Sequence, residues 1–191
     1  MVIGSFFLYT LDFKKVVSIL KKLLKIILIA LTIDSVILNM EGQHLKIEEF
    51  KDITIAYVRR TGKYGSENKI LMENFKEYLR AKNLLDQNSI ILGIALDNPA
   101  ITDKDNLRYD VGLIINGNPD IALDIRKIPD GIYAVFELPH TEQDVTAFWS
   151  NIQQLAGGLS VDETKPVIER YSADKVAKHL CEFCIPLKNL S

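Results

Sequence analysis

The sequence predicts an α+β domain over residues 41–191, made of an antiparallel sheet and two helices, behind a hydrophobic and basic extension over residues 1–40. Three observations predict this class. Short runs rich in β-branched and aromatic residues alternate with amphipathic stretches of helical spacing. The order strand, helix, strand, strand then occurs twice along the chain. With 191 residues, of which 48% are hydrophobic, the chain can also bury a core of ordinary size.

The extension over residues 1–40 differs from the rest of the chain in charge and pattern. It holds five lysines against two aspartates, and apolar residues recur at helical spacing at Val16, Val17, Leu20, Leu23, Leu24 and Ile27. A membrane-spanning helix needs about 20 predominantly apolar residues, and Asp34 interrupts the run here. No small-residue cleavage site of a secretory signal follows Leu38. Three interpretations stay open: a loosely attached helix, an amphipathic helix on a membrane surface, or residues upstream of a true start at Met40.

The first half of the domain opens with a strand. Its predicted elements are a strand at 53–61, a helix from Ser66 to Asn83, and strands at 90–96 and 107–115. Glycines at 62 and 65 supply the turn after the first strand, and Ser66 is expected to cap the helix. The apolar face of this helix is predicted to consist of Ile70, Leu71, Met72, Phe75, Tyr78 and Leu79.

The second half repeats this order. Its predicted elements are an entering segment at 121–127, a strand at 132–138, a helix after Thr141, and strands at 167–171 and 179–187. Thr141 and Asp144 form a capping box, and Gly157 and Gly158 end the helix.

The two halves correspond residue by residue. Ala56 corresponds to Ala134 at an offset of 78 residues, and Asp110 to Glu182 at an offset of 72. The sequence therefore predicts a duplicated β-α-β-β unit whose two helices flank a central groove. Such grooves are the usual sites for small ligands.

Charge and cysteine usage exclude several classes of function. Residues 41–191 carry 18 basic and 23 acidic side chains, a poor match for a phosphate backbone, so we expect no direct binding of nucleic acid. Cys181 and Cys184 lie three residues apart on a predicted strand. They therefore point to opposite faces, which excludes a disulfide between them. We expect no metal and no cofactor, and two semi-buried thiols in a reducing cytoplasm.

The two corresponding acids differ in their sequence neighbours. Arg108 precedes Asp110 by two residues on the same predicted strand face and is expected to compensate it, whereas Leu180 takes that place before Glu182. An unpaired carboxylate is costly to bury. Glu182 is therefore expected to attract a cationic ligand or to have a raised pKa, while Asp110 is expected to be structural.

Aromatic residues are the other candidates for the groove. Trp149 is the only tryptophan and falls on the second helix, where it offers a flat stacking surface or fills the core. Weaker candidates lie on or near the strands, at Tyr64, Tyr109, Phe136 and Tyr171.

Four stretches together resemble the GyrI-like family, which includes effector-binding domains of bacterial multidrug-responsive transcription activators and gyrase-inhibitory proteins. They are IAYVRRTGKYG, IALDNPAITDKDNLRYDVGLII, DGIYAVFELPHT and CEFCIPL, and the resemblance extends from about Leu45 to Leu187. It implies the duplicated fold and recognition of hydrophobic, often cationic, aromatic compounds, commonly through a buried glutamate on the last strand, here Glu182. The activator pattern includes an attached DNA-binding domain, which this sequence does not show.

Three functions are compatible with these observations. The favoured hypothesis is a binding module that captures a lipophilic, cationic aromatic compound. The second is a hydrolase of reactive cyclopropane compounds, with Glu182 as general acid or base. The third is a gyrase-inhibitory type of protein interaction. Binding is favoured over catalysis because nothing beyond one carboxylate indicates chemistry.

Overall fold

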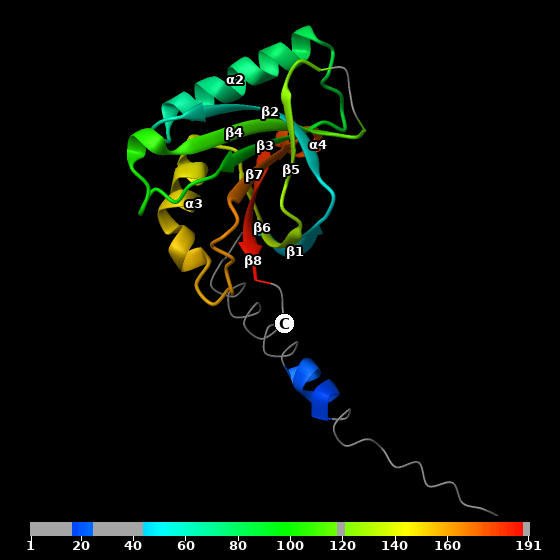
Figure 1. Ribbon diagram of the computed structural model, residues 1–191, viewed down its shortest axis with the longest axis vertical. Helices are drawn as coiled ribbons and strands as arrows, with labels where there is room; N and C mark the ends of the chain where they lie inside the picture. Colours follow the sequence, from blue (N-terminus) through cyan, green and yellow to red (C-terminus); the bar gives the residue numbers. More distant parts are fainter. Residues whose placement is uncertain (1–16, 25–43, 118–120, 189–191) are drawn as a thin grey trace, which may run out of the picture.

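The computed structural model describes residues 17–24, 44–117 and 121–188. Within the last two ranges lies one eight-stranded sheet in the order β1-β6-β8-β7-β3-β4-β2-β5, in which every neighbouring pair is antiparallel (Figure 1). The strands are β1 (His44–Phe50), β2 (Thr54–Thr61), β3 (Ile90–Ala95), β4 (Arg108–Ile115), β5 (Asp124–Lys127), β6 (Gly131–Pro139), β7 (Val167–Ser172) and β8 (Leu180–Leu187). The predicted α+β class is confirmed.

Two long helices accompany the sheet. They are α2 (Ser66–Ala81) and α3 (Glu142–Leu155), and two short ones are η1 (Lys104–Asn106) and α4 (Ala173–Val176). The predicted N-cap at Thr141 is confirmed, because its side chain accepts a hydrogen bond from the Asp144 backbone N–H at 3.1 Å. The predicted cap at Ser66 is wrong. Gly65 precedes α2 with a φ of 135° and no side-chain cap bond, so Ser66 already belongs to the helix.

The strand order shows how the two β-α-β-β segments meet. The first segment contributes the run β2-β4-β3 and the second the run β6-β8-β7, and β3 pairs with β7 in the middle of the sheet. β1, which the sequence pattern missed, extends the sheet beyond β6, and the entering segment forms β5 beside β2. The residue-by-residue equivalence of the two segments stays a prediction.

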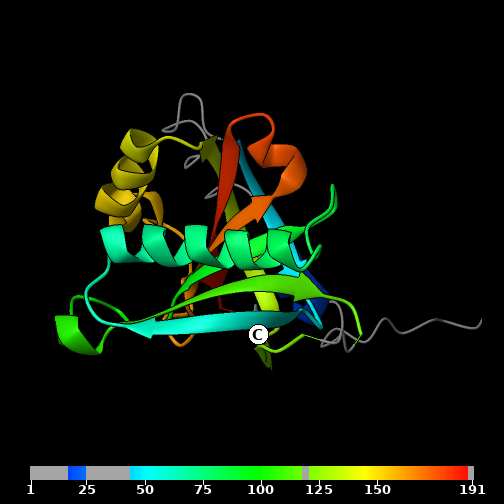
Figure 2. The same ribbon diagram turned by 90° about the horizontal axis from the view of Figure 1, so that it is seen from above.

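Side chains alternate between the two faces of the sheet, and each face has its own core. On the helix side, Phe75 and Leu79 of α2 pack with odd-numbered residues of β4, and Phe148 of α3 packs with odd-numbered residues of β8. Figures 1 and 2 show α2 over one part of the sheet and α3 beside another. Tyr171 of β7 contacts both helix-side clusters, so it lies where they meet.

The opposite face carries a core without a long helix. Its buried residues include Phe50, Ile55, Tyr133 and Ile168, and the Phe50 and Tyr133 rings stack with centroids 4.3 Å apart. Cys184 belongs to this core, whereas Cys181 belongs to the core under α3. The prediction that the two cysteines point to opposite faces is confirmed, and both are free thiols.

The extension is described only in part. Residues 17–24 form a helix with exposed apolar side chains at Ile19, Leu20, Leu23 and Leu24, the last at 66%. Among the described residues, no helix is both long and apolar enough to cross a membrane. The proposed start at Met40 and most of residues 1–40 lie outside the described ranges, so the boundary between extension and domain stays a prediction.

Candidate functional site

Glu169 lies at the centre of the sheet. It stands on β7, directly opposite Gly93 of β3. These are the two strands at which the halves of the sheet meet. Its side chain is on the helix side of the sheet, like that of Tyr171 two residues further along β7, because residues two apart share a face. Sequence reasoning did not single out this residue.

Three neutral donors converge on the Glu169 carboxylate from three different elements. The hydroxyls of Tyr109 on β4 and Tyr171 on β7 each donate to Oε2 at 2.8 Å. The indole Nε1 of Trp149 on α3 donates to Oε1 at 3.3 Å. We call these four residues the Glu169 cluster. Three of the six residues that the sequence predicted for the site are therefore brought together, around an acid that it did not predict.

The charge state of the Glu169 cluster is set mainly by burial. Burial raises the pKa of the Glu169 carboxyl above its ordinary value, although the three donated hydrogen bonds act in the opposite direction. Burial, followed by the nearby Glu169 charge, also raises the pKa of the Tyr109 and Tyr171 hydroxyls well above the usual range. No lysine or arginine among the described residues forms an ion pair with Glu169. The carboxylate is therefore solvated by neutral dipoles alone.

The four residues of the Glu169 cluster differ in their exposure as whole residues. Glu169, Tyr171 and Trp149 are each half-buried, whereas Tyr109 is only 3% exposed. Glu169 and Tyr171 place their side chains on the helix side of the sheet, where Trp149 of α3 meets the carboxylate. Tyr109 supports them from within the core.

The other two aromatic candidates do not bond to Glu169. Tyr64 donates from its hydroxyl to the backbone oxygen of Arg108 at 2.9 Å, and its ring meets that of Tyr109 edge to face at 6.1 Å. Tyr64 therefore packs against Tyr109 without contacting the carboxylate. Phe136 is fully buried and packs against Phe148 with ring centroids 5.8 Å apart, so it contributes to the core under α3.

Glu182 lies on the face opposite the helices and is not an unpaired acid. Arg170, its direct partner across β7 and β8, donates from Nε to Oε2 at 2.7 Å, and Lys46 Nζ lies 3.0 Å from Oε1. Burial opposes ionisation of this 2% exposed residue, but Arg170 and Lys46 outweigh it and lower the pKa of the carboxyl. The expectation of a raised pKa was therefore wrong. The compensating cations come from other strands, Arg170 from β7 and Lys46 from β1, and not from β8 itself.

The expected partner of Asp110 on its own strand is also wrong. Arg108 does not compensate this carboxylate, because it forms a double hydrogen bond with Asp97. Instead Arg59, directly opposite on β2, donates to both carboxylate oxygens at 2.6 and 3.0 Å, and Arg126 of β5 donates to Oδ2. Asp110 is fully buried. The prediction that it is structural is consistent with these bonds.

A family model for the GyrI-like small molecule binding domain matches residues 44–188 of the chain. The chain belongs to this family. A curated relative supports the assignment: the SPbeta prophage-derived protein YosT of Bacillus subtilis (strain 168), proposed to be a transcriptional regulator, is 40% identical over 148 residues. That alignment covers 75% of this chain and 99% of YosT.

Solved structures share the fold of this GyrI-like domain at low sequence identity. EcmrR in its complex with DNA matches with a TM-score of 0.64 and 12% identity, over 90% of this chain and 69% of EcmrR. SAV2435, solved bound to tetraphenylphosphonium, matches with a TM-score of 0.56 and 15% identity, over 76% of this chain and 94% of SAV2435. At such identities the likeness shows the fold alone.

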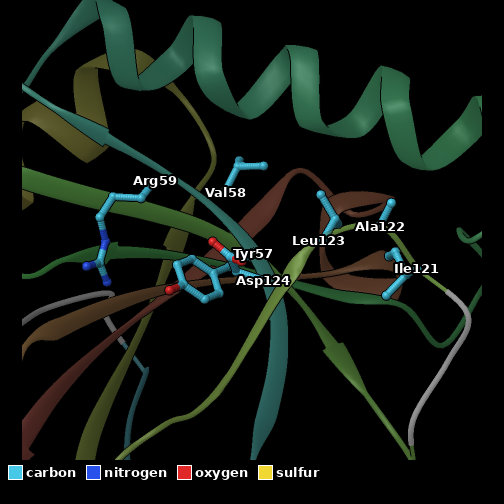
Figure 3. A pocket seen from close by; sticks show the side chains of 7 residues that line it. All are labelled: Tyr57, Val58, Arg59, Ile121, Ala122, Leu123 and Asp124. Atoms are coloured by element: carbon cyan, nitrogen blue, oxygen red, sulfur yellow. The ribbon is translucent and has the colours of Figure 1, made fainter.

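A separate depression lies at the edge of the sheet in this GyrI-like domain. It has a volume of about 500 Å³ and is lined by Tyr57, Val58, Arg59, Ile121, Ala122, Leu123 and Asp124 (Figure 3). These residues come from β2, from residues 121–123 and from the first residue of β5. None of the six predicted site residues lines it, so it is not the groove predicted between the helices.

Proposed function

We propose that this GyrI-like domain binds a lipophilic aromatic cation at Glu169, between α2 and α3. One observation carries the proposal: the Glu169 carboxylate receives three hydrogen bonds from neutral donors and meets no cation among the described residues. The acid in this role is Glu169 and not Glu182. In this proposal the chain is an effector-type domain whose function is to bind a ligand.

The energetics of a buried carboxylate favour a cationic ligand. A charged group removed from water is costly unless an opposite charge compensates it. Neutral donors stabilise the ionised form of Glu169 only in part, because its pKa stays raised. A ligand cation near Oε1 would supply the missing charge, and the Trp149 and Tyr171 rings would offer cation–π contacts. Lipophilic groups on the ligand match these aromatic surfaces.

The comparisons support the ligand class only at the level of relatives. SAV2435 shares the fold and was solved with a lipophilic cation. YosT, proposed to be a transcriptional regulator, shares 40% of its aligned residues with this chain. We therefore propose an effector-binding role of the multidrug-recognition type in the cytoplasm, which does not require the domain itself to contact nucleic acid.

The first prediction tests the charge at Glu169. In Glu169→Gln, we expect tetraphenylphosphonium to bind more than about tenfold more weakly, because a neutral amide replaces the compensating charge. Triphenylphosphine oxide, a neutral aromatic compound of related shape, should lose less than about twofold. Isothermal titration calorimetry with both compounds measures the two dissociation constants.

A matched control separates the site from general charge effects. Glu182→Gln removes one negative charge from the opposite face, next to Arg170. We expect it to leave the affinity for tetraphenylphosphonium within about twofold. Equal losses for the cation and the neutral compound in Glu169→Gln, or a larger cation loss in Glu182→Gln, would contradict the proposal.

Catalysis is the second candidate, and the same cluster favours it. A carboxyl group with a raised pKa lies 2.8 Å from two tyrosine hydroxyls, so a proton donor and acceptor are adjacent. Hydrolysis of a reactive cyclopropane needs such a pair, one group to protonate the opening ring and one to activate water. We expect any turnover of an electrophilic cyclopropane to vanish in both Glu169→Gln and Tyr171→Phe. Product analysis by mass spectrometry tests this, and no turnover by the unmodified protein removes the candidate.

The two halves of the sheet support a second proposal, on the origin of the fold. We propose that β2-α2-β3-β4 and β6-α3-β7-β8 are copies of one unit, which would place Glu169 next to the axis that relates them. The matching strand order supports this proposal. A superposition of residues 54–115 on 131–187 tests it, with low deviation over all four elements expected.

A further inference from the structure

Gly93 occupies an unusual place for a glycine. It lies in the interior of β3, a central strand, between Val111 of β4 and Glu169 of β7. Glycine inside a strand lacks packing and costs backbone entropy, and it often marks a close approach of another group. The missing side chain of Gly93 would point to the helix side, as that of Ile91 does. The place it would occupy is therefore directly beside the Glu169 cluster.

The Tyr109 hydroxyl fills the space that a side chain at position 93 would take. A Cβ atom built on Gly93 would lie 2.2 Å from Tyr109 Oη, 3.1 Å from Tyr109 Cζ and 2.9 Å from Glu169 Oε2. Tyr109 stands on β4 and pairs with Ala95, so its ring must extend across β3 to reach β7. It does so over the bare backbone of Gly93.

Tyr109 has little freedom to move away from an added methyl group. It is 3% exposed, it packs in the core under α2, and Tyr64 contacts its ring edge to face. Relief of the 2.2 Å contact to an ordinary one of 3.4 Å or more requires the hydroxyl to shift by more than 1 Å. Its hydrogen bond to Glu169, now 2.8 Å long, would not survive such a shift.

We propose that Gly93 is a positioning residue of the Glu169 cluster: its missing side chain lets the Tyr109 hydroxyl cross β3 and hold the Glu169 carboxylate. The role of this cluster in ligand binding rests on the proposed function. The hydrogen bond itself does not, because it is present without ligand. Gly93 thereby acts on Glu169 through Tyr109 and through steric exclusion, without a polar group of its own.

The expected effect is a change in the ionisation of Glu169. In Gly93→Ala the carboxylate loses one donor to its charged form, so its pKa should rise by about one unit, a tenfold change in the ionisation constant. Tyr109→Phe removes the same donor and should raise the pKa by a similar amount. Because both changes remove one bond, the double variant Gly93→Ala/Tyr109→Phe should show no more than the shift of Tyr109→Phe. Carbon NMR of the glutamate carboxyl across a pH titration measures the three values.

The groups that face Glu169 must be held constant in this titration. They are Tyr171 on its own strand, Trp149 on α3, and Cys181 on β8, whose thiol pKa is raised to about 12 mainly by burial and then by Glu169. All three are unchanged in every variant. Trp149 does not titrate, and burial raises the pKa of the Tyr171 hydroxyl and the Cys181 thiol far above the acid range. The carboxyl signal that disappears in Glu169→Gln identifies Glu169 among the other glutamates.

Gly112→Ala is the matched control. Gly112 also lies inside a strand, and a Cβ there would lie 2.7 Å from Ile55 on the opposite face. We expect it to lower the melting temperature without moving the pKa of Glu169. The double variant should be more stable than Gly93→Ala, because it lacks the atom at 2.2 Å and keeps only the contacts at 2.9 Å to Glu169 Oε2 and at 3.1 Å to the ring carbon.

Two results would overturn the proposal: an unchanged Glu169 pKa in Gly93→Ala, or a double variant whose shift equals the sum of the two single shifts. Tetraphenylphosphonium titration of the same samples keeps the proposed function separate. If the unmodified protein does not bind this cation but the pKa values change as expected, the function fails and the positioning role stands.

Discussion

Two glutamates of this chain have pKa values that are shifted in opposite directions. Glu182 meets Arg170 and Lys46, and these cations lower its pKa despite burial. Glu169 meets only hydroxyls and an indole, and burial raises its pKa. A full opposite charge outweighs the cost of desolvation, whereas neutral dipoles do not. The residue left with an uncompensated charge is the one suited to receive a cation.

The pH dependence of stability should differ between these two residues. The folded pKa of Glu182 is lowered, so its contribution is present above the ordinary value of 4.5 and is lost as pH falls through the folded pKa. The folded pKa of Glu169 is raised, so its contribution is present below 4.5 and is lost as pH rises through the folded pKa.

Substitution by glutamine should therefore change stability in opposite directions at neutral pH. Glu182→Gln is expected to lose about 2 kcal/mol at pH 7, because Arg170 and Lys46 keep their charges near a neutral amide. Glu169→Gln should be as stable as the unmodified protein or more stable at pH 7, with the difference shrinking toward pH 4. Urea unfolding at several pH values measures both, and a loss at pH 7 in Glu169→Gln equal to that in Glu182→Gln would contradict the assignment.

At the scale of elements, α3 positions the indole of the Glu169 cluster. The helix begins at Glu142 behind the Thr141 cap and carries Trp149 two turns later, with its ring edge to face against Phe148 and Phe183. The N-terminus of α2, in contrast, has no side-chain cap bond, and α2 is held mainly by Met72, Phe75 and Leu79. The two helices therefore depend on different interactions at their starts.

This difference predicts unequal effects of two similar substitutions. Thr141→Ala removes the bond to the Asp144 backbone N–H and should cost about 1 kcal/mol of folding free energy. Ser66→Ala removes no cap bond and should change stability by less than about 0.5 kcal/mol. Thermal unfolding of the two variants under identical conditions provides the comparison. A larger loss in Ser66→Ala would show that the cap of α2 had been misidentified.

At the scale of the whole molecule, one sheet joins three hydrophobic clusters, two on the helix side and one on the opposite face. The strands of both halves pair at β3 and β7, and Cys181 and Cys184 lie in different cores on adjacent parts of β8. Burial raises the pKa of each thiol to about 12. At neutral pH both are thus protonated as well as inaccessible, and thiolate is the reactive form.

Thiol labelling should therefore report how the molecule opens. If the sheet and its hydrophobic clusters unfold as one cooperative unit, a thiol reagent should modify Cys181 and Cys184 at the same rate in low denaturant. Almost no modification is expected without denaturant. Single variants Cys181→Ala and Cys184→Ala isolate each site, and mass spectrometry follows the modification. Faster labelling of Cys181 would show that α3 detaches from the sheet before the sheet unfolds.

The gyrase-inhibitory alternative also belongs to this scale. It concerns a surface of the assembled domain, and it stays a prediction from the resemblance alone. A supercoiling assay with and without the protein tests it directly. The binding proposal does not depend on its result, because it rests on the hydrogen bonds of the Glu169 cluster within the domain.

The sequence by itself determined the two long helices, most of the strands, their order and the faces of their side chains. Period-two alternation separated Cys181 from Cys184, the capping box located the start of α3, and the quoted motifs indicated the GyrI-like family, because these signals are local. Strand β1 was missed because Glu49 interrupts the alternation in HLKIEEF, and its pairing with β6 joins residues far apart in the sequence.

Only the tertiary structure decided which acid is compensated and which is not. Arg170 meets Glu182, and Gly93 meets Glu169, through the registers of β7 with β8 and of β7 with β3. Such contacts join residues of different strands, so spacing along the chain does not reveal them. A glycine inside β3 and the pair Glu169–Tyr171 on one face of β7 were the signals present in the sequence. These signals indicate a site only once the strand order places Tyr109 next to Gly93 and Glu169.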